Sequence, residues 1–518
     1  MQQRSISFCE NVGGDQFYFV YLSVSKLSPW RVSSSNNIVN SRKKYHLLSN
    51  IAIYRIIFQR LRNFVFQHNR MKQILFIFLS FAIFSCSNQI APANTVTTKP
   101  LPDSAFIGLQ TYPLASAKDL DTLLSKIGDA KVVLLGEATH GTAEFYNWRT
   151  EISKRLIIEK GFNTIAVEGD WADGIRVNNF IIGNKKDSIE VLRVLQLFDR
   201  WPSFLWANTE FLNFMLWLNN YNATRSASKK ITFYGTDLFS IMDAADTMSH
   251  RLNSDTVMAA IEQFRNCFDL FANDEQLYAK QDQKANCSEQ SKHLLEVTKK
   301  YNLGKDSLSA LFFLQAALTV FNGEQYFRLQ RNRTDVWNIR ENHMAESIRK
   351  LTDTDANKRK VIVWMHNSHT GDAFYASTHW SGRTSVGEIL REKMGEKNVY
   401  IIGFGSYSGY VTASQSWGGK IEQMQLANAE NATWEQTLHS MWGNDKYVIL
   451  HDTALNNKLK TRWIYTRSIG VIYHNNERSG MKLSRVAKRF DAYIFIDHST
   501  PVHPLHIQVK KAGIKIDE

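Results

Sequence analysis

Glu137 and His140 are the side chains whose types and spacing most directly suggest chemistry. They stand in VVLLGEATHGTAEF, residues 132–145, where an apolar run enters Gly136 and Gly141 follows the histidine. Because a strand-like run precedes the pair and a glycine closes it, we expect the pair in a loop. A histidine there can act as a general base toward water, while the carboxylate fixes its tautomer and stabilises the imidazolium. A strand end with a structural polar cap is the alternative.

Ionisable side chains close four successive strand-like runs in the same manner. The runs span 131–135, 163–168, 230–235 and 360–365, and the side chains at their ends are Glu137 with His140, Glu168 with Asp170, Asp237, and His366 with His369. Ligands of open parallel sheets bind at the carboxyl ends of the strands, so we expect these side chains to share one cleft. The spacing leaves a second interpretation open, a divalent-metal site whose ligands would be Glu137, His140, Glu168, His366 and His369.

The elements that would position these side chains indicate an α/β fold with a mostly parallel central sheet flanked by helices. Further strand-like runs at 399–404, 469–473 and 492–497 are apolar at nearly every position, as in strands covered on both faces. A helical pattern at 142–162, between the first two runs, favours the order strand, helix, parallel strand. Residues 240–350 have a helical pattern throughout and predict a largely helical insertion before the fourth strand.

A hydrophobic segment at 71–85 suggests export. MKQILFIFLSFAIFSCSN begins at Met71 with a lysine next to it, continues as an apolar run of about 11 residues, and reaches a small residue before Cys86. The run is too short for the roughly 20 residues that span a bilayer. Ser85 followed by Cys86 resembles a bacterial lipobox, which implies lipidation of Cys86 and a lipid anchor at the cell envelope, in the periplasm or at the outer membrane. An uncleaved signal anchor is the alternative.

A signal peptide at residue 71 predicts that Met71 is the true start and that 1–70 is a non-native leader. A genuine cytoplasmic extension is the alternative. We expect the polar, proline-containing stretch 86–105 to be a tether and 106–518 to be the catalytic domain. The leader holds ten Lys or Arg against two acidic residues, whereas the part from residue 86 onward is nearly balanced. The chain's net charge of +13 therefore gives little support for a nucleic-acid partner.

The spacing of the four cysteines excludes two kinds of cysteine site and permits one disulfide bond. No CxxC occurs in the sequence, so a zinc ribbon or a thioredoxin-type site is excluded on spacing. With Cys9 in the leader and Cys86 lipidated, Cys267 and Cys287 remain. An oxidising exterior would permit a disulfide between them, which the sequence alone does not establish.

Five motifs in order resemble those of the erythromycin esterase family. They lie between about Asp119 and His506 and read LLGEATHGTAEFYNWR, AVEGDW, YGTDL, WNIRENHMAE and VIVWMHNSHTGD. The resemblance implies an α/β fold with a helical insertion and hydrolysis of the macrolactone ester of 14-membered macrolides, which gives antibiotic resistance, without a serine nucleophile or a cofactor. It also implies the catalytic residues, which are His140, Glu137, Arg149, Glu168 and a distal histidine matched by His366, with His369 as the competing assignment.

The residues themselves agree with a mechanism that lacks a nucleophilic serine. No GxSxG elbow exists, and the nearest candidate, GSYSG at 405–409, places Tyr407 at its centre. No phosphate-binding GxxxxGK[ST] or GxGxxG occurs either, so nucleotide chemistry is unsupported. The hypothesis is that His140 abstracts a proton from a water that attacks an ester carbonyl, that Glu137 orients His140, and that Glu168 helps to hold the water or the imidazolium.

Arg149 and His366 are the candidates to stabilise the oxyanion or to protonate the leaving alkoxide. The alternative for Arg149 is an ion pair on a helix surface with Glu151 or Glu144. His369 and Asp237 are expected to bind substrate, although His369 could instead be a structural histidine with satisfied hydrogen bonds.

Two further side chains are candidates for substrate binding. Arg340, in WNIRENHMAE, could reach the cleft, although the seven-residue spacing of Trp337 and Met344 favours core positions for those two. The residue after this arginine is Glu341, where the family commonly has an aspartate. Trp206 belongs to RWPSFLWANTEF, whose aromatic residues could line an apolar surface for a macrolide or form a packed helix junction.

The leading hypothesis is therefore an exported ester hydrolase that acts on a small-molecule ester, which the resemblance implies to be a macrolide. A metal-dependent hydrolase of another substrate and a lipid-anchored ligand-binding protein are the alternatives. The sequence leaves the oligomeric state open.

Overall fold

In the computed structural model, the described residues are 106 and 108–505, with gaps at 184–187, 252, 281–284, 302–306, 331–332, 355–358, 452–456 and 475–479. The expected leader, signal peptide and tether, at 1–70, 71–85 and 86–105, lie outside the described residues, as does Cys86. Within the described part, no helix is both long and apolar enough to cross a membrane.

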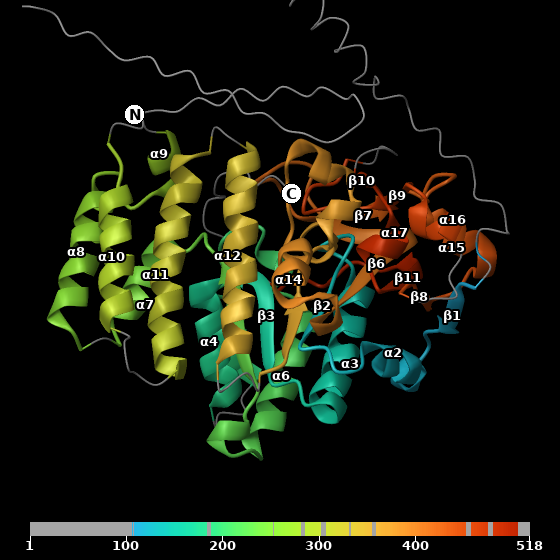
Figure 1. The fold of residues 1–518 in the computed structure, drawn as a ribbon, viewed down its shortest axis with the longest axis horizontal. Helices are drawn as coiled ribbons and strands as arrows, with labels where there is room; N and C mark the ends of the chain where they lie inside the picture. Colours follow the sequence, from blue (N-terminus) through green and yellow to red (C-terminus); the bar gives the residue numbers. More distant parts are fainter. Residues whose placement is uncertain are drawn as a thin grey trace, which may run out of the picture. The chain divides into compact units, whose positions relative to one another are not determined.

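A nine-stranded mixed sheet forms the centre of the described part (Figure 1). Its order is β1-β8-β11-β6-β2-β5-β3-β4, and β7 pairs with β6. The strands from β11 to β4 run parallel, whereas β8 pairs antiparallel with β1 and β11, and β7 pairs antiparallel with β6. The bounds are β1 (Gln110–Pro113), β2 (Val132–Leu135), β3 (Thr164–Asp170), β4 (Thr232–Asp237), β5 (Val361–Trp364), β6 (Val399–Ala413), β7 (Glu422–Leu426), β8 (Lys446–Ile449) and β11 (Ala492–Ser499). The predicted α/β class with a mostly parallel sheet is confirmed.

Helices cover both faces of the sheet, which is why its central strands are apolar at consecutive positions. Val133 and Leu135 of β2 belong to the core shared with α3 (Ala143–Lys160), α4 (Trp171–Ile182) and α6 (Thr209–Ala223). Val132 and Leu134 belong to the opposite core, which they share with α12 (Arg333–Asp353), α14 (Val386–Met394) and α15 (Trp434–Trp442). The shorter helices are α2 (Asp121–Ile127), α5 (Ser188–Leu195), α13 (Asn367–Thr370), α16 (Asn457–Thr461) and α17 (Val486–Arg489).

The predicted helical insertion is confirmed. Between β4 and β5 the chain forms α7 (Ile241–Ser249), α8 (Asp255–Asp269), α9 (Glu275–Lys280), α10 (Ser288–Tyr301), α11 (Ser307–Arg328) and α12. Most of these helices pack around an apolar cluster of their own, and α12 lies between this bundle and the sheet (Figure 1). Cys267 of α8 and Cys287, which precedes α10, form a disulfide with their Cα atoms 5.9 Å apart.

One predicted strand, 469–473, is wrong. Among the described residues, its only pairing is an isolated bridge between Ser414 and Ile472. The strand of this region is β9 (Ile464–Arg467), which pairs antiparallel with β10 (Met481–Ser484) in a separate sheet. Ile469 and Tyr473 are buried against β6 and β7, so the apolar pattern of the segment reflects burial without a ladder. The other six predicted runs lie on β2, β3, β4, β5, β6 and β11.

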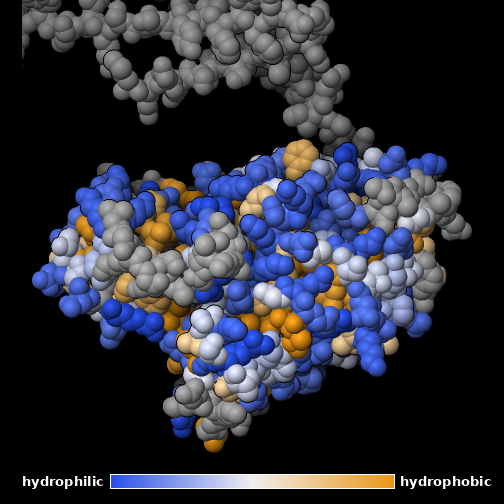
Figure 2. Space-filling view, turned by 60° about the horizontal axis from the view of Figure 1, so that its bottom comes forward, coloured by the Kyte–Doolittle hydropathy of each residue, from blue (hydrophilic) through white to orange (hydrophobic). Residues whose placement is uncertain are grey.

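The visible surface fits this division between buried and exposed residues. Figure 2 shows hydrophilic side chains over most of one face, with apolar residues in small groups between them. Loops interrupt the buried layers at the ends of the strands, which is where parallel sheets carry their functional side chains.

Candidate active site

The ends of four parallel strands and the helix α12 supply the polar side chains of the candidate site. Glu137 and His140 lie in the loop between β2 and α3. Glu168 lies near the carboxyl end of β3, and Asp237 is the last residue of β4. His366 caps α13 directly after β5. The backbone N–H of Asn367 donates to the carbonyl oxygen of Glu137 at 2.8 Å and thereby ties the loops after β2 and β5 together. The sequence therefore located the loops of the site, as expected from a parallel sheet.

A first network joins Glu137, His140 and Arg149. Glu137 Oε1 lies 2.9 Å from His140 Nδ1, and Glu137 Oε2 accepts a hydrogen bond of 2.8 Å from Arg149 Nη2. All three residues are buried. The Arg149 guanidinium lies over the rings of Tyr146, at 4.4 Å, and Trp364, at 4.8 Å. The alternative of a surface ion pair for Arg149 is therefore wrong, because α3 directs this side chain inward toward Glu137.

Glu137 is held as a carboxylate in this network. Burial disfavours its charged form, but the positive charge of Arg149 and the contact with His140 outweigh burial and hold the pKa of the carboxyl below its ordinary value. A carboxylate at Nδ1 of His140 favours the tautomer with the proton on that nitrogen, which leaves Nε2 as the basic nitrogen.

A second network joins Glu168, Asp237, Arg340 and His369. Arg340 Nη2 donates to Glu168 Oε1 at 2.8 Å and to Asp237 Oδ2 at 2.7 Å, and Arg340 Nε donates to Asp237 Oδ1 at 3.0 Å. His369 Nε2 lies 3.2 Å from Glu168 Oε1 and 3.1 Å from Arg340 Nη1. Its Nδ1 contacts the carboxylate of Glu341, the residue that follows Arg340 on α12. One turn of α12 thus delivers both a guanidinium and a carboxylate to the site.

Electrostatics fix the charges of this second network. Burial disfavours the charged ring of His369, but Glu168 and Glu341 outweigh burial and raise the pKa of His369 to about 9. Burial likewise opposes ionisation of Glu168, yet His369 and Arg340 hold the pKa of its carboxyl well below the ordinary value. The pKa of Arg340 is raised by Asp237 and Glu168 despite its burial. At neutral pH, therefore, Glu168 is anionic and His369 is cationic.

His366 lies beside the first network. Its ring centroid is 5.0 Å from that of His140, and its backbone N–H donates to Glu168 Oε2 at 2.9 Å. The ring nitrogens contact Ser368 Oγ, at 2.8 Å from Nδ1, and the carbonyl oxygen of Ile469, at 3.2 Å from Nε2. The structure thus separates the two candidate distal histidines, because His366 faces His140 whereas His369 is enclosed by Glu168 and Glu341.

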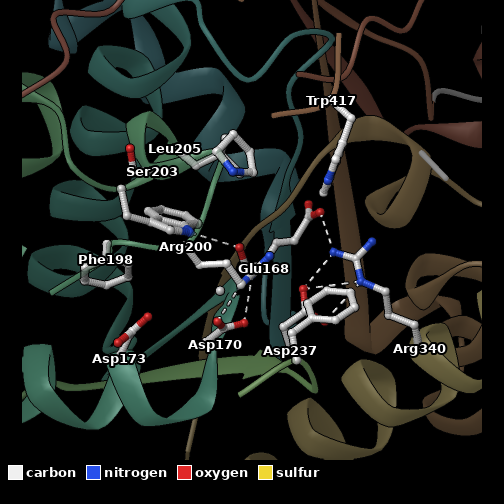
Figure 3. Close-up of a pocket in the computed structure, with 14 residues that line it drawn as sticks. Glu168, Asp170, Asp173, Phe198, Arg200, Ser203, Leu205, Asp237, Arg340 and Trp417 are labelled. Carbon is white, nitrogen blue, oxygen red and sulfur yellow. Dashed lines mark hydrogen bonds and ion pairs between the residues drawn. The ribbon is translucent and has the colours of Figure 1, made fainter. Parts of the chain in front are cut away.

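A small cavity adjoins the second network (Figure 3). Its lining includes Glu168, Asp237 and Arg340, and Figure 3 shows the ion pairs between them at its edge. Trp206 lines it too and donates its indole N–H to the carbonyl oxygen of Glu168 at 3.0 Å. His140 is not among the lining residues. The nearby Phe204 and Phe211 are fully buried in the core below the sheet, so only part of the aromatic run at 200–211 faces the cavity.

The alternative metal site has no assembled ligand set in the part of the chain that the structure describes. There, no group of three or more His, Cys, Asp or Glu side chains surrounds a common point. The carboxylates of the proposed ligand set are instead engaged by guanidinium groups, Glu137 by Arg149 and Glu168 by Arg340.

The sequence did not identify two residues that shape the site, Glu341 and Arg200. Glu341 was noted only as a departure from a family pattern, yet its carboxylate contacts His369 and accepts the backbone N–H of Val386 at 2.9 Å. Arg200 holds Asp170 through two hydrogen bonds of 2.8 and 2.9 Å. The available signal was their position, since Glu341 directly follows a candidate arginine and Arg200 begins the aromatic run.

Comparisons with known proteins agree with the fold and identify a family. The family model of erythromycin esterase matches residues 157–499, a range that contains Glu168, Asp237, Arg340, His366 and His369. Glu137, His140 and Arg149 precede it. Among curated proteins, erythromycin esterase type II of Escherichia coli is 23% identical over 376 residues, covering 66% of this chain and 85% of that protein. Putative hydrolase YbfO of Bacillus subtilis is 24% identical over 455 residues, covering 83% of this chain and 96% of that protein.

Solved structures share the fold at low identity. A protein from Bacillus cereus has a TM-score of 0.64 at 19% identity, covering 81% of this chain and 99% of its own. A succinoglycan biosynthesis protein has a TM-score of 0.60 at 20% identity, covering 76% of this chain and 96% of its own. An erythromycin esterase mutant in its open conformation has a TM-score of 0.55 at 14% identity, covering 80% of this chain and 100% of its own.

Proposed function

We propose, from the premise that this chain belongs to the erythromycin esterase family, that it hydrolyses a carboxylic ester with a water activated by His140. Family membership supports a hydrolase of the esterase type. The observation that carries the mechanism is the buried Glu137–His140 pair, whose carboxylate is held ionised by Arg149. No serine nucleophile is required.

The proposed reaction uses His140 as both base and acid. His140 Nε2 takes a proton from water as the water oxygen attacks the ester carbonyl, and Glu137 stabilises the imidazolium that forms. When the tetrahedral intermediate collapses, the bond from the carbonyl carbon to the alkoxide oxygen breaks. The alkoxide then takes the proton from His140, which leaves an acid, an alcohol and neutral His140.

Neighbouring side chains have supporting roles in this proposal. Arg149 contacts Glu137 from within the core, so it acts as a positioning residue for the Glu137–His140 pair. His366 lies 5.0 Å from His140 between ring centroids and is the candidate donor to the oxyanion or the leaving group. Glu168, which is anionic and lies between the two networks, would stabilise the His140 imidazolium and hold the attacking water.

A macrolide lactone is the proposed substrate class, and antibiotic resistance the proposed consequence. The support is the family and a curated relative described as an erythromycin esterase. Export and lipidation of Cys86 remain part of the proposal, because they would place the hydrolase at the cell envelope. Cys86→Ser should abolish incorporation of a radiolabelled fatty acid and release the protein from the membrane fraction.

The decisive experiment incubates the purified protein with 14- and 16-membered macrolides and with simple esters. Mass spectrometry should detect products that have gained one water, and the gain should vanish in His140→Ala. Recovery of every substrate intact after long incubation would contradict hydrolysis and favour a ligand-binding protein. Activity that is lost on chelation and restored by a divalent metal would contradict the metal-free mechanism.

A further inference from the structure

Two large aromatic side chains are exposed on the segment between α13 and α14. Phe374 is 57% exposed and Trp380 is 65% exposed. Phe374 contacts His379, the neighbour of Trp380, with ring centroids 5.0 Å apart, and Trp380 packs against Trp463 with ring centroids 4.9 Å apart. Single exposed apolar residues are common, whereas a group of them indicates a surface that contacts a partner.

Cationic side chains lie beside these rings, and they are Arg383, Lys482 and Arg485. The Arg485 guanidinium lies over the Trp463 ring at 4.9 Å, and an isolated bridge between Ala376 and Ser484 joins β10 to the segment of the exposed rings. All three cations are partly exposed, and none forms an ion pair with an Asp or Glu of the described chain. These cations and the rings of Phe374, Trp380 and Trp463 are together named the Trp380 patch.

Positive charge in the Trp380 patch is not balanced at Lys482. Burial lowers the pKa of Lys482, and the charges of Arg383 and Arg489 lower it further, while no carboxylate raises it. This combination arises where cations gather and no carboxylate lies close enough to stabilise them.

The carboxylates at the border of the patch have other partners. Glu388 Oε2 accepts a hydrogen bond of 3.0 Å from Thr384 Oγ1, and Glu388 Oε1 lies 3.5 Å from His379 Nδ1. Asp372 Oδ2 lies 3.2 Å from Arg391 Nη1. An anionic surface is therefore the charge complement of the Trp380 patch.

The patch is joined to the active site through Trp337. The Arg383 guanidinium lies over the Trp337 ring at 5.0 Å, and that ring stacks on His369 with centroids 5.0 Å apart. Close by, Asn338 Nδ2 donates to the carbonyl oxygen of Gly382 at 2.9 Å, which fixes the segment of the exposed rings to α12. A partner that covers the Trp380 patch would therefore lie beside the active site.

The composition of the patch favours a bilayer surface as that partner. Indole rings are enriched at the level of the lipid headgroups, and Lys and Arg attract anionic headgroups. Single-stranded nucleic acid also binds cations and aromatic rings, but it needs free ring faces on which bases stack. Trp380 and Trp463 pack against each other, and Arg485 covers the Trp463 ring. The predicted lipid anchor at Cys86 would in addition raise the effective concentration of this domain at a bilayer.

We propose that the Trp380 patch docks onto a bilayer that contains anionic phospholipids, so that the active site lies beside the membrane. Each cation contributes about fivefold to the affinity, so the patch orients an anchored domain and does not replace the anchor. An ester dissolved in the bilayer would then reach the site directly. That access rests on the proposed hydrolysis, whereas docking does not, and docking is measured without any ester.

A local fluorescent probe tests docking in the full chain. Cys9→Ser and Cys86→Ser remove the other thiols, since Cys267 and Cys287 form a disulfide, and Ser381→Cys carries a polarity-sensitive fluorophore beside Trp380. With vesicles of equal parts phosphatidylcholine and phosphatidylglycerol, we expect the emission to shift to shorter wavelength. The shift should be absent with phosphatidylcholine alone and should disappear at high salt. No shift with the anionic vesicles would overturn the proposal.

The same fluorophore on Ile158→Cys is the control for position. Ile158 is 60% exposed on α3, outside the Trp380 patch, and the chain before residue 106 is the same in both labelled proteins. Its emission should not change. A shift at residue 158 equal to that at residue 381 would mean that another part of the chain brings the protein to the vesicles, and it would contradict docking through the patch.

Charge variants test the cations. Arg383→Gln combined with Lys482→Gln should raise the lipid concentration for half of the shift by at least about tenfold. Lys292→Gln combined with Lys299→Gln, which removes two exposed cations from α10, should leave it unchanged. Equal effects of the two double variants would contradict a role of the patch and show only a response to net charge.

Trp380→Ser tests the aromatic part. The side chain is exposed, so the variant should fold, and the shift at residue 381 should be reduced. If the Arg383 and Lys482 double variant does not fold, as judged by circular dichroism, Trp380→Ser carries the test, and an unchanged shift in it would contradict docking. A shift produced by single-stranded oligothymidylate that matches the shift with vesicles would overturn the bilayer as the partner in favour of a nucleic acid.

Discussion

Glu137 with His140 and Glu341 with His369 are two buried carboxylate–histidine pairs in one site, but their surroundings differ. In the first pair, the second carboxylate oxygen binds Arg149, so a cation lies beyond the carboxylate. In the second pair, the second ring nitrogen lies 3.2 Å from another carboxylate, Glu168, so the histidine lies between two anions.

The difference shows how one kind of pair can serve two tasks. A general base must take up and release a proton near the working pH. His369, with a pKa of about 9, keeps its proton at neutral pH and acts as a fixed positive charge for Glu168. Glu137, the partner of His140, instead shares its carboxylate with Arg149. We therefore expect His140 to move a proton and His369 to hold one.

The strongest test of this division is His140→Ala. We expect hydrolysis to fall by about 10²- to 10⁴-fold, the usual contribution of a general base, with the unfolding free energy changed by about 1 kcal/mol. The measurements are kcat/KM by mass spectrometry and urea unfolding. His439→Ala is the control, because His439 Nδ1 also pairs with a carboxylate, that of Asp497 at 2.6 Å, and does not line the cavity. Activity of the His140 variant within tenfold of the wild type would contradict its role.

Arg149→Met should have the next largest effect, because it leaves the buried Glu137 without its main positive neighbour. We expect the unfolding free energy at pH 7 to fall by about 3 to 5 kcal/mol. In the wild type the lowered pKa of Glu137 contributes stability above its unfolded pKa, and this contribution is lost as the pH falls through the folded pKa. The gap between variant and wild type should therefore narrow on acidification.

Urea unfolding between pH 4 and 8 measures that gap. Lys154→Met, on the same helix, removes a partly exposed cation that pairs with Glu151 at 2.7 Å. It should change stability by no more than about 0.5 kcal/mol at any pH. A constant gap for Arg149→Met across this range would show that Glu137 does not depend on the arginine charge.

The sequence could predict the loops of both pairs because parallel strands place their carboxyl ends together. Apolar runs located β2, β3, β4 and β5, and the polar residues after them were brought into one site. The same pattern failed at 469–473, where Ile469 donates its N–H to the Ala138 carbonyl oxygen at 2.6 Å and accepts from His366 through its own carbonyl. Apolar periodicity reports burial, and it does not distinguish a strand from a segment packed over a site.

The pairing of atoms within the site was beyond the sequence. His366 and His369 are three residues apart at the start of α13, yet one ring faces His140 and the other Glu341. That choice depends on α12, which arrives from a helical insertion of over a hundred residues, and no local pattern encodes its position. Glu341 was accordingly not predicted as a partner.

Glu341→Gln tests whether the second pair holds a proton. The raised pKa of His369 contributes stability that is fully present below its unfolded pKa of about 6.5 and is lost as the pH rises through about 9. Without Glu341 the pKa should fall toward its ordinary value, so this loss should occur at lower pH. We expect the variant to be about 1 to 2 kcal/mol less stable near pH 7.5, with the difference shrinking above pH 9.

Unfolding free energies from pH 6 to 10 give this profile, and Glu341→Asp is the matched variant that keeps the charge. If Glu341→Gln and Glu341→Asp both lost the same unfolding free energy at every pH, Glu341 would act only through packing and its hydrogen bond from the Val386 N–H.

The smallest expected effect comes from Trp337, whose ring stacks on His369 with centroids 5.0 Å apart and planes inclined by 13°. An aromatic face favours the charged imidazolium by about 0.5 to 1 kcal/mol, so Trp337→Leu should lower the pKa of His369 by less than one unit. Trp337→Phe keeps an aromatic face but loses the indole hydrogen bond of 2.8 Å to the Thr384 carbonyl oxygen. The pKa of His369 in this variant should therefore stay close to that of the wild type. Proton NMR titration of the His369 ring measures both. A larger fall in Trp337→Leu than in Glu341→Gln would mean that stacking, and not the second carboxylate, keeps His369 charged.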